Sequence, residues 1–245
     1  MSKAWPRVLV GCPTYAGKAY CLERFAESVR AIDYPNFDVL LVDNSRDDGK
    51  FAREVERRGL PCIRGPVRKR PDGTIAASRE ILRRRAVREG YDYFFNLEQD
   101  VMVPPDTLTR LVSHQKDVVG GWYFVTKGLL DRHGTLTHYL KEPCVHVGTA
   151  KDDGRLRGGD SQALDLRLLG PGLLRVRVGS FGVCLMSTRV LGKFTFRPDA
   201  KGVYYDGTMF YLELAERRIP AYVDTELLVP HFQTYAHSNS LKNDQ

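Results

Sequence analysis

Two carboxylates lie one residue apart directly after an apolar, aromatic run that is typical of a buried strand. The run covers residues 93–97, and Glu98 and Asp100 follow it, before a short apolar piece and two prolines. Side chains at positions i and i+2 of an extended chain point to the same side, so both carboxylates are expected to face one point. Carboxylate oxygens suit Mg2+ or Mn2+, whose shell substrate phosphates usually complete. The pattern alone also fits a solvated acidic turn.

Polar residues also end two earlier apolar runs of the strand type. The run over residues 7–15 ends at Thr14 and Tyr15, and the run over residues 37–42 ends at Asp43. Strands that alternate with helical patterns indicate βαβ units and a mostly parallel sheet, in which ligands bind beyond the carboxyl ends of the strands. We therefore expect these polar ends to gather along one edge with the two carboxylates.

The expected fold class is α/β, with a mostly parallel central sheet flanked by helices. In the first half we expect strands at 7–15, 37–42, 61–64, 93–97 and 117–124, and helices at 20–32, 47–58, 74–89 and 107–114. Residues 127–172 are rich in glycine, proline and charge, which favours a long excursion with short strands and a hairpin. Further on we expect a strand at 173–178, short helices at 187–191 and 206–217, and strand pieces at 221–224 and 226–229. A structural role for Asp206, as the N-cap of its helix, is the alternative to a catalytic one.

Composition narrows the class of protein. The 245 residues are 42% hydrophobic and 27% charged, an ordinary globular balance, and the five cysteines are odd in number with no C-x-x-C pair. This cysteine pattern favours reduced thiols. The sequence also has no apolar run of membrane-spanning length and no signal-peptide pattern, so we expect a cytoplasmic protein. The net charge of +7, with basic clusters at 64–70 and 79–88, suits nucleotide phosphates, nucleic acid or an acidic membrane surface.

The order of the motifs resembles family 2 of the GT-A nucleotide-sugar glycosyltransferases, from Val8 to His231. The resemblance rests on Pro13-Thr14-Tyr15, Asp43-Asn44-Ser45, Ala77-Ser78-Arg79, Glu98-Gln99-Asp100, Ser180-Phe181-Gly182, Asp206 and Val229-Pro230-His231. Each motif is weak alone, and the complete series in this order is specific. It implies one GT-A domain over residues 1–245, with a nucleotide-binding half (7–124), an acceptor-binding half (125–235) and a frayed tail (236–245). The excursion in the acceptor-binding half is expected to be small and antiparallel or irregular.

The resemblance implies a nucleotide-sugar donor, most often a UDP- or GDP-sugar, and assigns residues to it. Thr14, Tyr15 and Asp43 match the strand ends that bind the nucleobase. Arg70 and Arg79 match positions that contact the nucleotide or its phosphates. The acceptor is a molecule with a hydroxyl group whose identity the sequence does not give. No nucleic acid and no transmembrane segment are expected, and contact with a membrane surface stays open.

The resemblance also implies a divalent ion, Mn2+ or Mg2+, and a catalytic base. Glu98 and Asp100 match the D-x-D motif that holds the ion on the donor phosphates, and His231 matches the histidine that completes the shell. Asp206 matches the acid that deprotonates the acceptor hydroxyl in inverting members. The expected activity is therefore metal-dependent, inverting transfer of a hexosyl group. The lack of apolar helices after His231 favours a non-processive enzyme.

This chain departs from the family pattern at two positions. Glu98 replaces the first Asp of the motif, which makes Asp100 the safer metal ligand. Tyr205 occupies the place where the family often has Glu before the catalytic acid, and Glu213 and Asp224 are then alternative bases.

Two other functions stay open on sequence alone. A nucleotidyltransferase of similar fold would need a glycine-rich phosphate loop after the first strand, and residues 11–18 match one faintly. A catalytically silent module that binds nucleotide or nucleic acid would explain the net charge. Carboxylates at the ligand edge oppose that interpretation, since they repel phosphate unless a metal ion intervenes.

Overall fold

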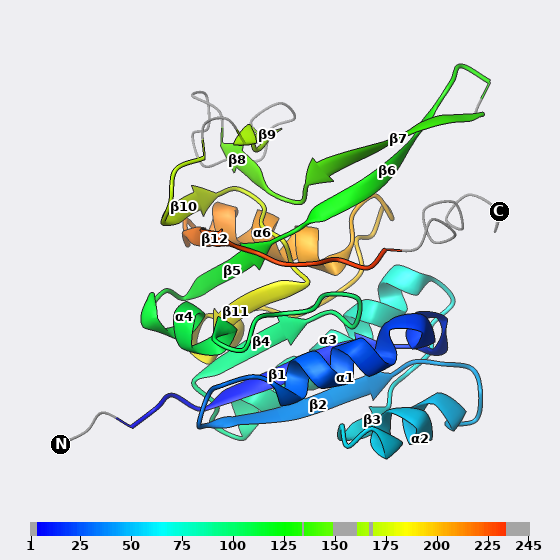
Figure 1. Cartoon of the computed structure of the whole chain (residues 1–245), viewed down its shortest axis with the longest axis vertical. Helices are drawn as coiled ribbons and strands as arrows, with labels where there is room; N and C mark the ends of the chain where they lie inside the picture. Colours follow the sequence, from blue (N-terminus) through cyan, green and yellow to red (C-terminus); the bar gives the residue numbers. More distant parts are fainter. Residues whose placement is uncertain (1–3, 134, 149–160, 167–168, 234–245) are drawn as a thin grey trace.

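The structure is a computed structural model of the chain, and it describes residues 4–133, 135–148, 161–166 and 169–233. Its main strands are β1 (Val8–Thr14), β2 (Phe37–Asp43), β3 (Cys62–Arg64), β4 (Tyr93–Leu97), β5 (Val118–Trp122), β10 (Leu173–Val176), β11 (Val183–Ser187) and β12 (Ala221–Leu228). They form one 8-stranded sheet in the order β10-β12-β5-β11-β4-β1-β2-β3 (Figure 1). The predicted central sheet is confirmed.

The helices are η1 (Ala16–Cys21, a 3-10 helix), α1 (Leu22–Arg30), α2 (Lys50–Arg57), α3 (Pro71–Arg88), α4 (Thr107–Ser113), α5 (Thr188–Leu191) and α6 (Asp206–Glu216). Helix α3 begins three residues earlier than expected, because Pro71 at its first position has a φ already suited to the helix. Asp206 is the first residue of α6 and Tyr205 is the N-cap, so the alternative role of Asp206 as N-cap does not hold.

Within the 8-stranded sheet most strand pairs are parallel, as expected for βαβ units. Strands β1, β2, β3 and β4 pair in parallel, and so do β5 and β12. Strand β11 runs antiparallel between β4 and β5, and β10 runs antiparallel at the edge beside β12. The two strand pieces expected near the end of the chain form the single strand β12, whose register shifts between Val223 and Leu228.

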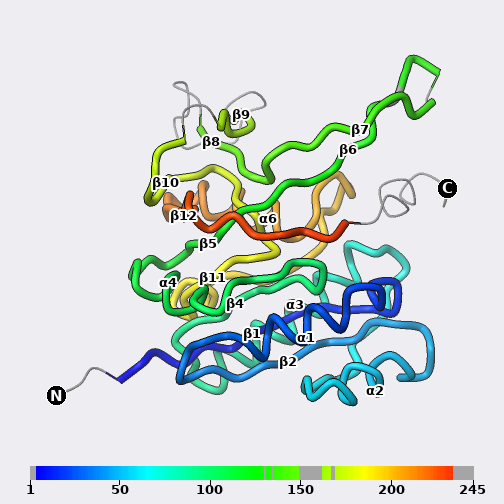
Figure 2. The backbone as a smooth tube through the Cα atoms, in the orientation of Figure 1, coloured from blue at the N-terminus to red at the C-terminus, as the bar shows by residue number. Residues whose placement is uncertain are grey.

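The predicted excursion contains a hairpin of β6 (Phe124–Leu130) and β7 (Leu136–Pro143), and a small antiparallel pair of β8 (His146–Gly148) and β9 (Ser161–Ala163). The hairpin projects from the body of the molecule (Figure 2). Residues 149–160 and 167–168 of the excursion and the expected tail lie outside the described residues.

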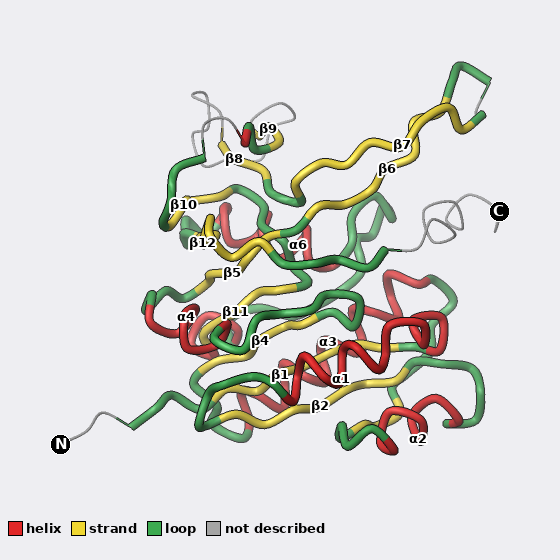
Figure 3. Tube along the Cα trace, in the orientation of Figure 1, coloured by secondary structure: helices red, strands yellow, loops and turns green. Residues whose placement is uncertain are grey.

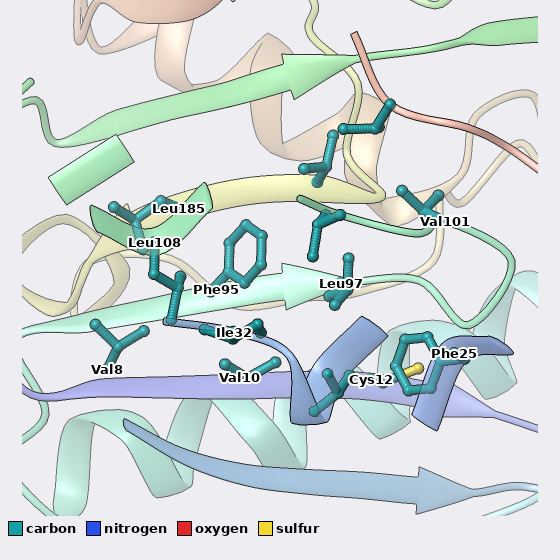
Figure 4. Packing of buried hydrophobic residues seen from close by; sticks show 14 of the residues in the cluster. Val8, Val10, Cys12, Phe25, Ile32, Phe95, Leu97, Val101, Leu108 and Leu185 are labelled. Carbon is teal, nitrogen blue, oxygen red and sulfur yellow. The ribbon is translucent and has the colours of Figure 1, made fainter. Parts of the chain in front are cut away.

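Each face of the sheet has its own hydrophobic core, because successive residues of a strand point to opposite sides. On β1, Val8, Val10 and Cys12 pack with Phe25 of α1 and with residues of α2 and α4 (Figure 4). Leu9 points the other way, into a cluster with residues of α3, α5 and α6. The helices therefore cover both faces of the sheet (Figure 3).

The chain from Gly11 to Thr14 lies inside β1, where every residue is buried. The following residues form η1 instead of a glycine-rich loop. The phosphate loop that a nucleotidyltransferase would need directly after the first strand is thus absent from residues 11–21.

Among the described residues, no helix has the length and apolar character needed to cross a bilayer.

Candidate active site

The carboxyl ends of β1 and β2 bring two of the predicted nucleobase residues to one edge. Thr14 and Asp43 are opposite each other in the β1–β2 register. One Asp43 oxygen, Oδ1, accepts hydrogen bonds from the backbone N–H of Ser45 at 2.9 Å and from its hydroxyl at 2.5 Å. The other, Oδ2, is buried with no hydrogen-bond partner. A buried acceptor without a partner is costly, so Oδ2 suits a donor N–H brought by a ligand.

Gln99, in the middle of the Glu98-Gln99-Asp100 series, is a residue whose role the sequence did not indicate. It is fully buried. Its Oε1 accepts a hydrogen bond from the Thr14 hydroxyl, and its Nε2 donates to the carbonyl of Lys18 at 2.8 Å. Gln99 thereby ties the end of β1 and helix η1 to the acidic turn.

Tyr15, the third predicted nucleobase residue, is extended and directly precedes η1. Burial raises the pKa of its phenol. Its ring lies against Gly17, where a Cβ would come within 2.3 Å of a ring carbon. Glycine at position 17 therefore makes room for the tyrosine ring.

Asp100 lies between two cationic or potentially cationic side chains. The Lys18 ammonium is 2.8 Å from its Oδ1, and His231 Nε2 is 3.4 Å from its Oδ2. Burial alone would raise the pKa of the Asp100 carboxyl, but the contacts with His231 and Lys18 outweigh it and hold the pKa well below its usual value. Asp100 is therefore ionised at neutral pH.

His231 comes to this edge through an isolated antiparallel bridge between its backbone and Val101. Burial lowers the pKa of the imidazole, but its hydrogen bond to Asp100 and the carboxylate charge raise it more, so the net change is upward. The Nδ1 atom is 3.1 Å from the carbonyl oxygen of Phe124, which can only accept. Both ring nitrogens thus face acceptors, and a metal ion at Nε2 would replace the proton shared with Asp100 and leave Nδ1–H to donate to Phe124, as in metal-binding histidines.

The side chains of Glu98 and Asp100 do not point to the same place, contrary to the expectation from their i and i+2 spacing. Strand β4 ends at Leu97, and a turn closed by the Val101 N–H on the Glu98 carbonyl at 2.9 Å follows. Glu98 consequently turns to Arg79, at 2.5 Å, while Asp100 turns to Lys18 and His231.

The side chains around Asp100 suit a divalent ion for which the protein supplies only some of the ligands. In the described residues, no three His, Cys, Asp or Glu side chains gather in a metal-binding group. Asp100 and His231 supply an ionised carboxylate and an oriented imidazole side by side. Two such ligands fit an ion whose remaining positions are filled by substrate phosphates.

Arg79 connects Glu98 to Asp206, a link that no local pattern indicated. From α3 its guanidinium donates to Asp206 Oδ1 at 2.6 Å, to Glu98, and to the side-chain oxygen of Asn96 at 3.2 Å. It also lies 4.7 Å from the centre of the Phe181 ring. The arginine predicted to contact the nucleotide is thus held among carboxylates, 4% exposed.

Asp206, the predicted base, begins α6 and has a fully buried side chain. Its Oδ2 has no hydrogen-bond partner, whereas Oδ1 is held by Arg79. Burial raises the pKa of this carboxyl, and the opposing charge of Arg79 does not cancel the increase. A carboxylate with a raised pKa and an unengaged oxygen is suited to take a proton.

Arg70, the other predicted nucleotide contact, is the N-cap residue of α3 and is half-exposed. Its guanidinium pairs with Asp72 and lies 3.4 Å from the carbonyl oxygen of Asp199, in the connection that leads to α6.

The alternative bases lie in other environments. Glu213 pairs with Arg217 on the surface of α6 at 2.7 Å. Asp224 pairs with Arg110 of α4 and with His114, the residue after α4; burial would raise its pKa, but these partners lower it overall. Of the three candidate carboxylates, Asp206 alone is linked to Glu98 through Arg79.

Replacing Arg79 by methionine is expected to reduce the free energy of unfolding by about 3–5 kcal/mol, the usual cost of leaving one partner of a buried ion pair uncompensated. Arg84→Met is the matched control on the same helix, since that arginine is 72% exposed and its pair with Glu80 should contribute less than about 1 kcal/mol. Urea unfolding at pH 7 measures both. Equal losses in the two variants would show that the Arg79 network contributes no more than a surface pair.

The fold is shared with glycosyltransferases of known structure. A mannosyltransferase, PcManGT from Pyrobaculum calidifontis in complex with GDP-Man and Mn2+, aligns over 96% of this chain and 61% of its own, at 16% identity and a TM-score of 0.56. GalNAc-T7 with UDP, GalNAc and Mn2+ aligns over 94% and 44%, at 12% identity and 0.59. TarS of S. aureus aligns over 95% and 37%, at 12% identity and 0.53. This chain thus spans less than two thirds of each of these proteins.

These likenesses define the class as a GT-A-like glycosyltransferase fold. The sequence profile described as "Glycosyl transferase family 2" matches residues 10–159, more than half of the chain. The protein belongs to glycosyltransferase family 2. No curated protein sequence matches the chain significantly.

Proposed function

We propose that the protein transfers a sugar from a nucleoside diphosphate donor to an acceptor hydroxyl, with a divalent ion and with inversion at the anomeric carbon. The observation that supports this most is that a candidate metal site and a candidate base are linked at one edge of the sheet. Asp100 and His231 form the candidate metal site. Glu98, next to Asp100 in the same turn, is connected through Arg79 to the candidate base Asp206.

The donor is expected to lie across the carboxyl ends of β1, β2 and β4. Thr14, Tyr15 and Asp43 would hold the base, where the free Oδ2 of Asp43 suits an N–H of uracil or guanine. We propose a UDP- or GDP-sugar, because the structures of similar fold hold GDP-Man or UDP. Of the two arginines proposed to contact the nucleotide, Arg79 is buried, and Arg70 at the start of α3 is the partly exposed one.

Asp100 and His231 would hold the ion against the donor diphosphate. Bound there, Mn2+ or Mg2+ would act as a Lewis acid that neutralises the charge developing on the leaving diphosphate. Lys18, on the other oxygen of Asp100, adds a second positive charge at the same place.

Asp206 is proposed as the general base. Its Oδ2 would take the proton of the acceptor hydroxyl while the oxygen bonds to the anomeric carbon and the bond from that carbon to the diphosphate oxygen breaks. Attack opposite the leaving group inverts the configuration. Because the side chain is fully buried, the groups that cover Asp206 must move aside when the acceptor enters.

Other parts of the proposal concern the chain as a whole. We propose that residues 7–124 bind the nucleotide and residues 125–235 contribute the acceptor side, and that the protein acts in the cytoplasm. The second half supports this division because it contains Asp206, His231 and the projecting β6–β7 hairpin (Figure 2).

Release of nucleoside diphosphate from candidate UDP- and GDP-sugars tests the proposal. We expect release with one of the two donor classes in the presence of Mn2+, with loss of activity when a chelator removes the metal. No release from any donor, or release unaffected by the chelator, would contradict metal-dependent sugar transfer.

A further inference from the structure

A hollow of about 670 Å3 lies between α3 and the chain segment 194–198, which connects α5 to α6. Its floor is apolar and includes Ala77 and Ile81 of α3 and the ring of Phe196, which is 5% exposed. The Phe196 ring packs against Phe181 and Phe210, so the floor is continuous with the core beside α6. We call this hollow the α3 groove.

The rim of the α3 groove is strongly cationic. Five basic side chains line it, Arg68, Lys69, Arg70, Arg84 and Arg197, against two carboxylates. Clustered positive charge beside an apolar floor focuses an attractive field on anionic ligands.

Both carboxylates of the groove are already engaged. Asp72 pairs with Arg70. Glu80 pairs with Arg83 and Arg84 and accepts the backbone N–H of Phe196 at 3.1 Å, which fixes the segment 194–198 to the helix. No acid of the groove is left to neutralise its remaining cations.

Three cations of the rim have no protein counter-ion. Within the part of the chain that the structure describes, the side chains of Arg68, Lys69 and Arg197 form no ion pair or hydrogen bond. They come from both walls, the loop before α3 and the segment after α5. A single anionic group between the walls would therefore be contacted from two sides.

The groove leads towards the proposed base. Phe196 and Arg197 also line a smaller hollow that Asp206 borders. Tyr205, next to Asp206, lies within electrostatic reach of both Asp206 and Asp72, and burial raises the pKa of its phenol. Tyr205 is thus near both Asp72 of the rim and the proposed base Asp206.

We propose that the α3 groove binds a phosphate ester that serves as the acceptor, with its phosphate held by Arg68, Lys69 and Arg197 and its organic part on the apolar floor. Calling this ligand the acceptor rests on the proposed function. Arginine forks match phosphate oxygens in geometry and charge. A soluble sugar phosphate and a lipid-linked phosphate share this chemistry, and the floor of Ala77, Ile81 and Phe196 can pack either body.

Calorimetric titration of the full chain tests the proposal with three probes: inorganic phosphate, glucose 6-phosphate and octyl phosphate. We expect at least one ester to bind more tightly than inorganic phosphate, and the double variant Arg68→Gln/Arg197→Gln to weaken it by about tenfold or more, since two charged contacts are lost. Arg88→Gln is the control, because Arg88 lies on the same helix outside the groove and pairs with Glu89. It should leave the affinity unchanged.

Tighter binding of glucose 6-phosphate would point to a soluble acceptor, and tighter binding of octyl phosphate to a lipid-linked one. Failure of both esters, no preference over inorganic phosphate, or an equal loss in the Arg88 variant would overturn the assignment. Binding of UDP and GDP with Mn2+, measured on the same samples, separates the two hypotheses. If the nucleotides bind and the esters do not, the groove assignment alone fails. If the esters bind and no nucleotide does, the proposed function fails instead, and with it the description of the ester as an acceptor.

Discussion

Replacing Asp206 by asparagine is expected to reduce sugar transfer by about 10²-fold or more while leaving donor binding intact, because the amide cannot accept the proton of the acceptor hydroxyl. Burial raises the pKa of this carboxyl, which determines how the transfer rate should change with pH. The base is active only when ionised, so the rate should fall as the pH drops through a value above the usual range of Asp. That acid limb should disappear in the asparagine variant. Steady-state rates measured across pH, with nucleotide affinity measured separately, test both statements.

Glu213→Gln is the matched control for Asp206→Asn. Glu213 lies on the same helix, half-buried, borders the same small hollow as Asp206, and pairs with Arg217 at 2.7 Å. Its replacement should change transfer little. A near-normal rate in the Asp206 variant, or a comparable loss in the Glu213 variant, would move the base to another residue.

Replacing Asp100 by asparagine is expected to weaken Mn2+-dependent nucleotide binding by at least about tenfold. Removing a residue that merely supports a metal ligand already costs about 10- to 100-fold in metal affinity, so the loss of a ligand should cost no less. The charge that attracts the ion is lost, and so is the partner of His231 and Lys18. Calorimetry with and without Mn2+ should show that only the metal-dependent part of the affinity disappears.

Asp106→Asn controls for the general loss of a carboxylate in this region, since Asp106 is exposed and precedes α4. It should bind nucleotide and Mn2+ as the wild type does. Undiminished metal-dependent binding in the Asp100 variant would remove Asp100 from the proposed ligand set.

The central sheet could be predicted because its signal is local. Runs such as Val8–Val10 and Tyr93–Phe95 are apolar without interruption, since parallel strands are buried on both faces. Where a strand stops, the next polar residue is at the ligand edge, which placed Thr14, Asp43 and Asp100 there. The strand order was less accessible, because β11 enters between β4 and β5 through pairing with residues far away in the chain.

The contacts within the candidate site could not be predicted from the sequence. Arg79 and Asp206 are 127 positions apart, so no spacing rule could indicate their ion pair. Glu98 and Asp100 were expected to converge, but the turn after β4 sends them to different partners. Asp43 and Asp206 share a feature that only the structure reveals, a buried carboxylate oxygen without a hydrogen-bond partner.

A thermal-shift panel of UDP, GDP, CDP and dTDP, each with and without Mn2+, tests the proposed nucleotide-sugar site most directly. A ligand that binds only the folded protein raises its stability, by about 2.7 kcal/mol at a hundredfold excess over the dissociation constant. We predict a shift with UDP or GDP that requires Mn2+ and is lost in Asp100→Asn. No shift with any of the four nucleotides, or an equal shift without metal, would contradict a metal-dependent nucleotide-sugar site at this edge of the sheet.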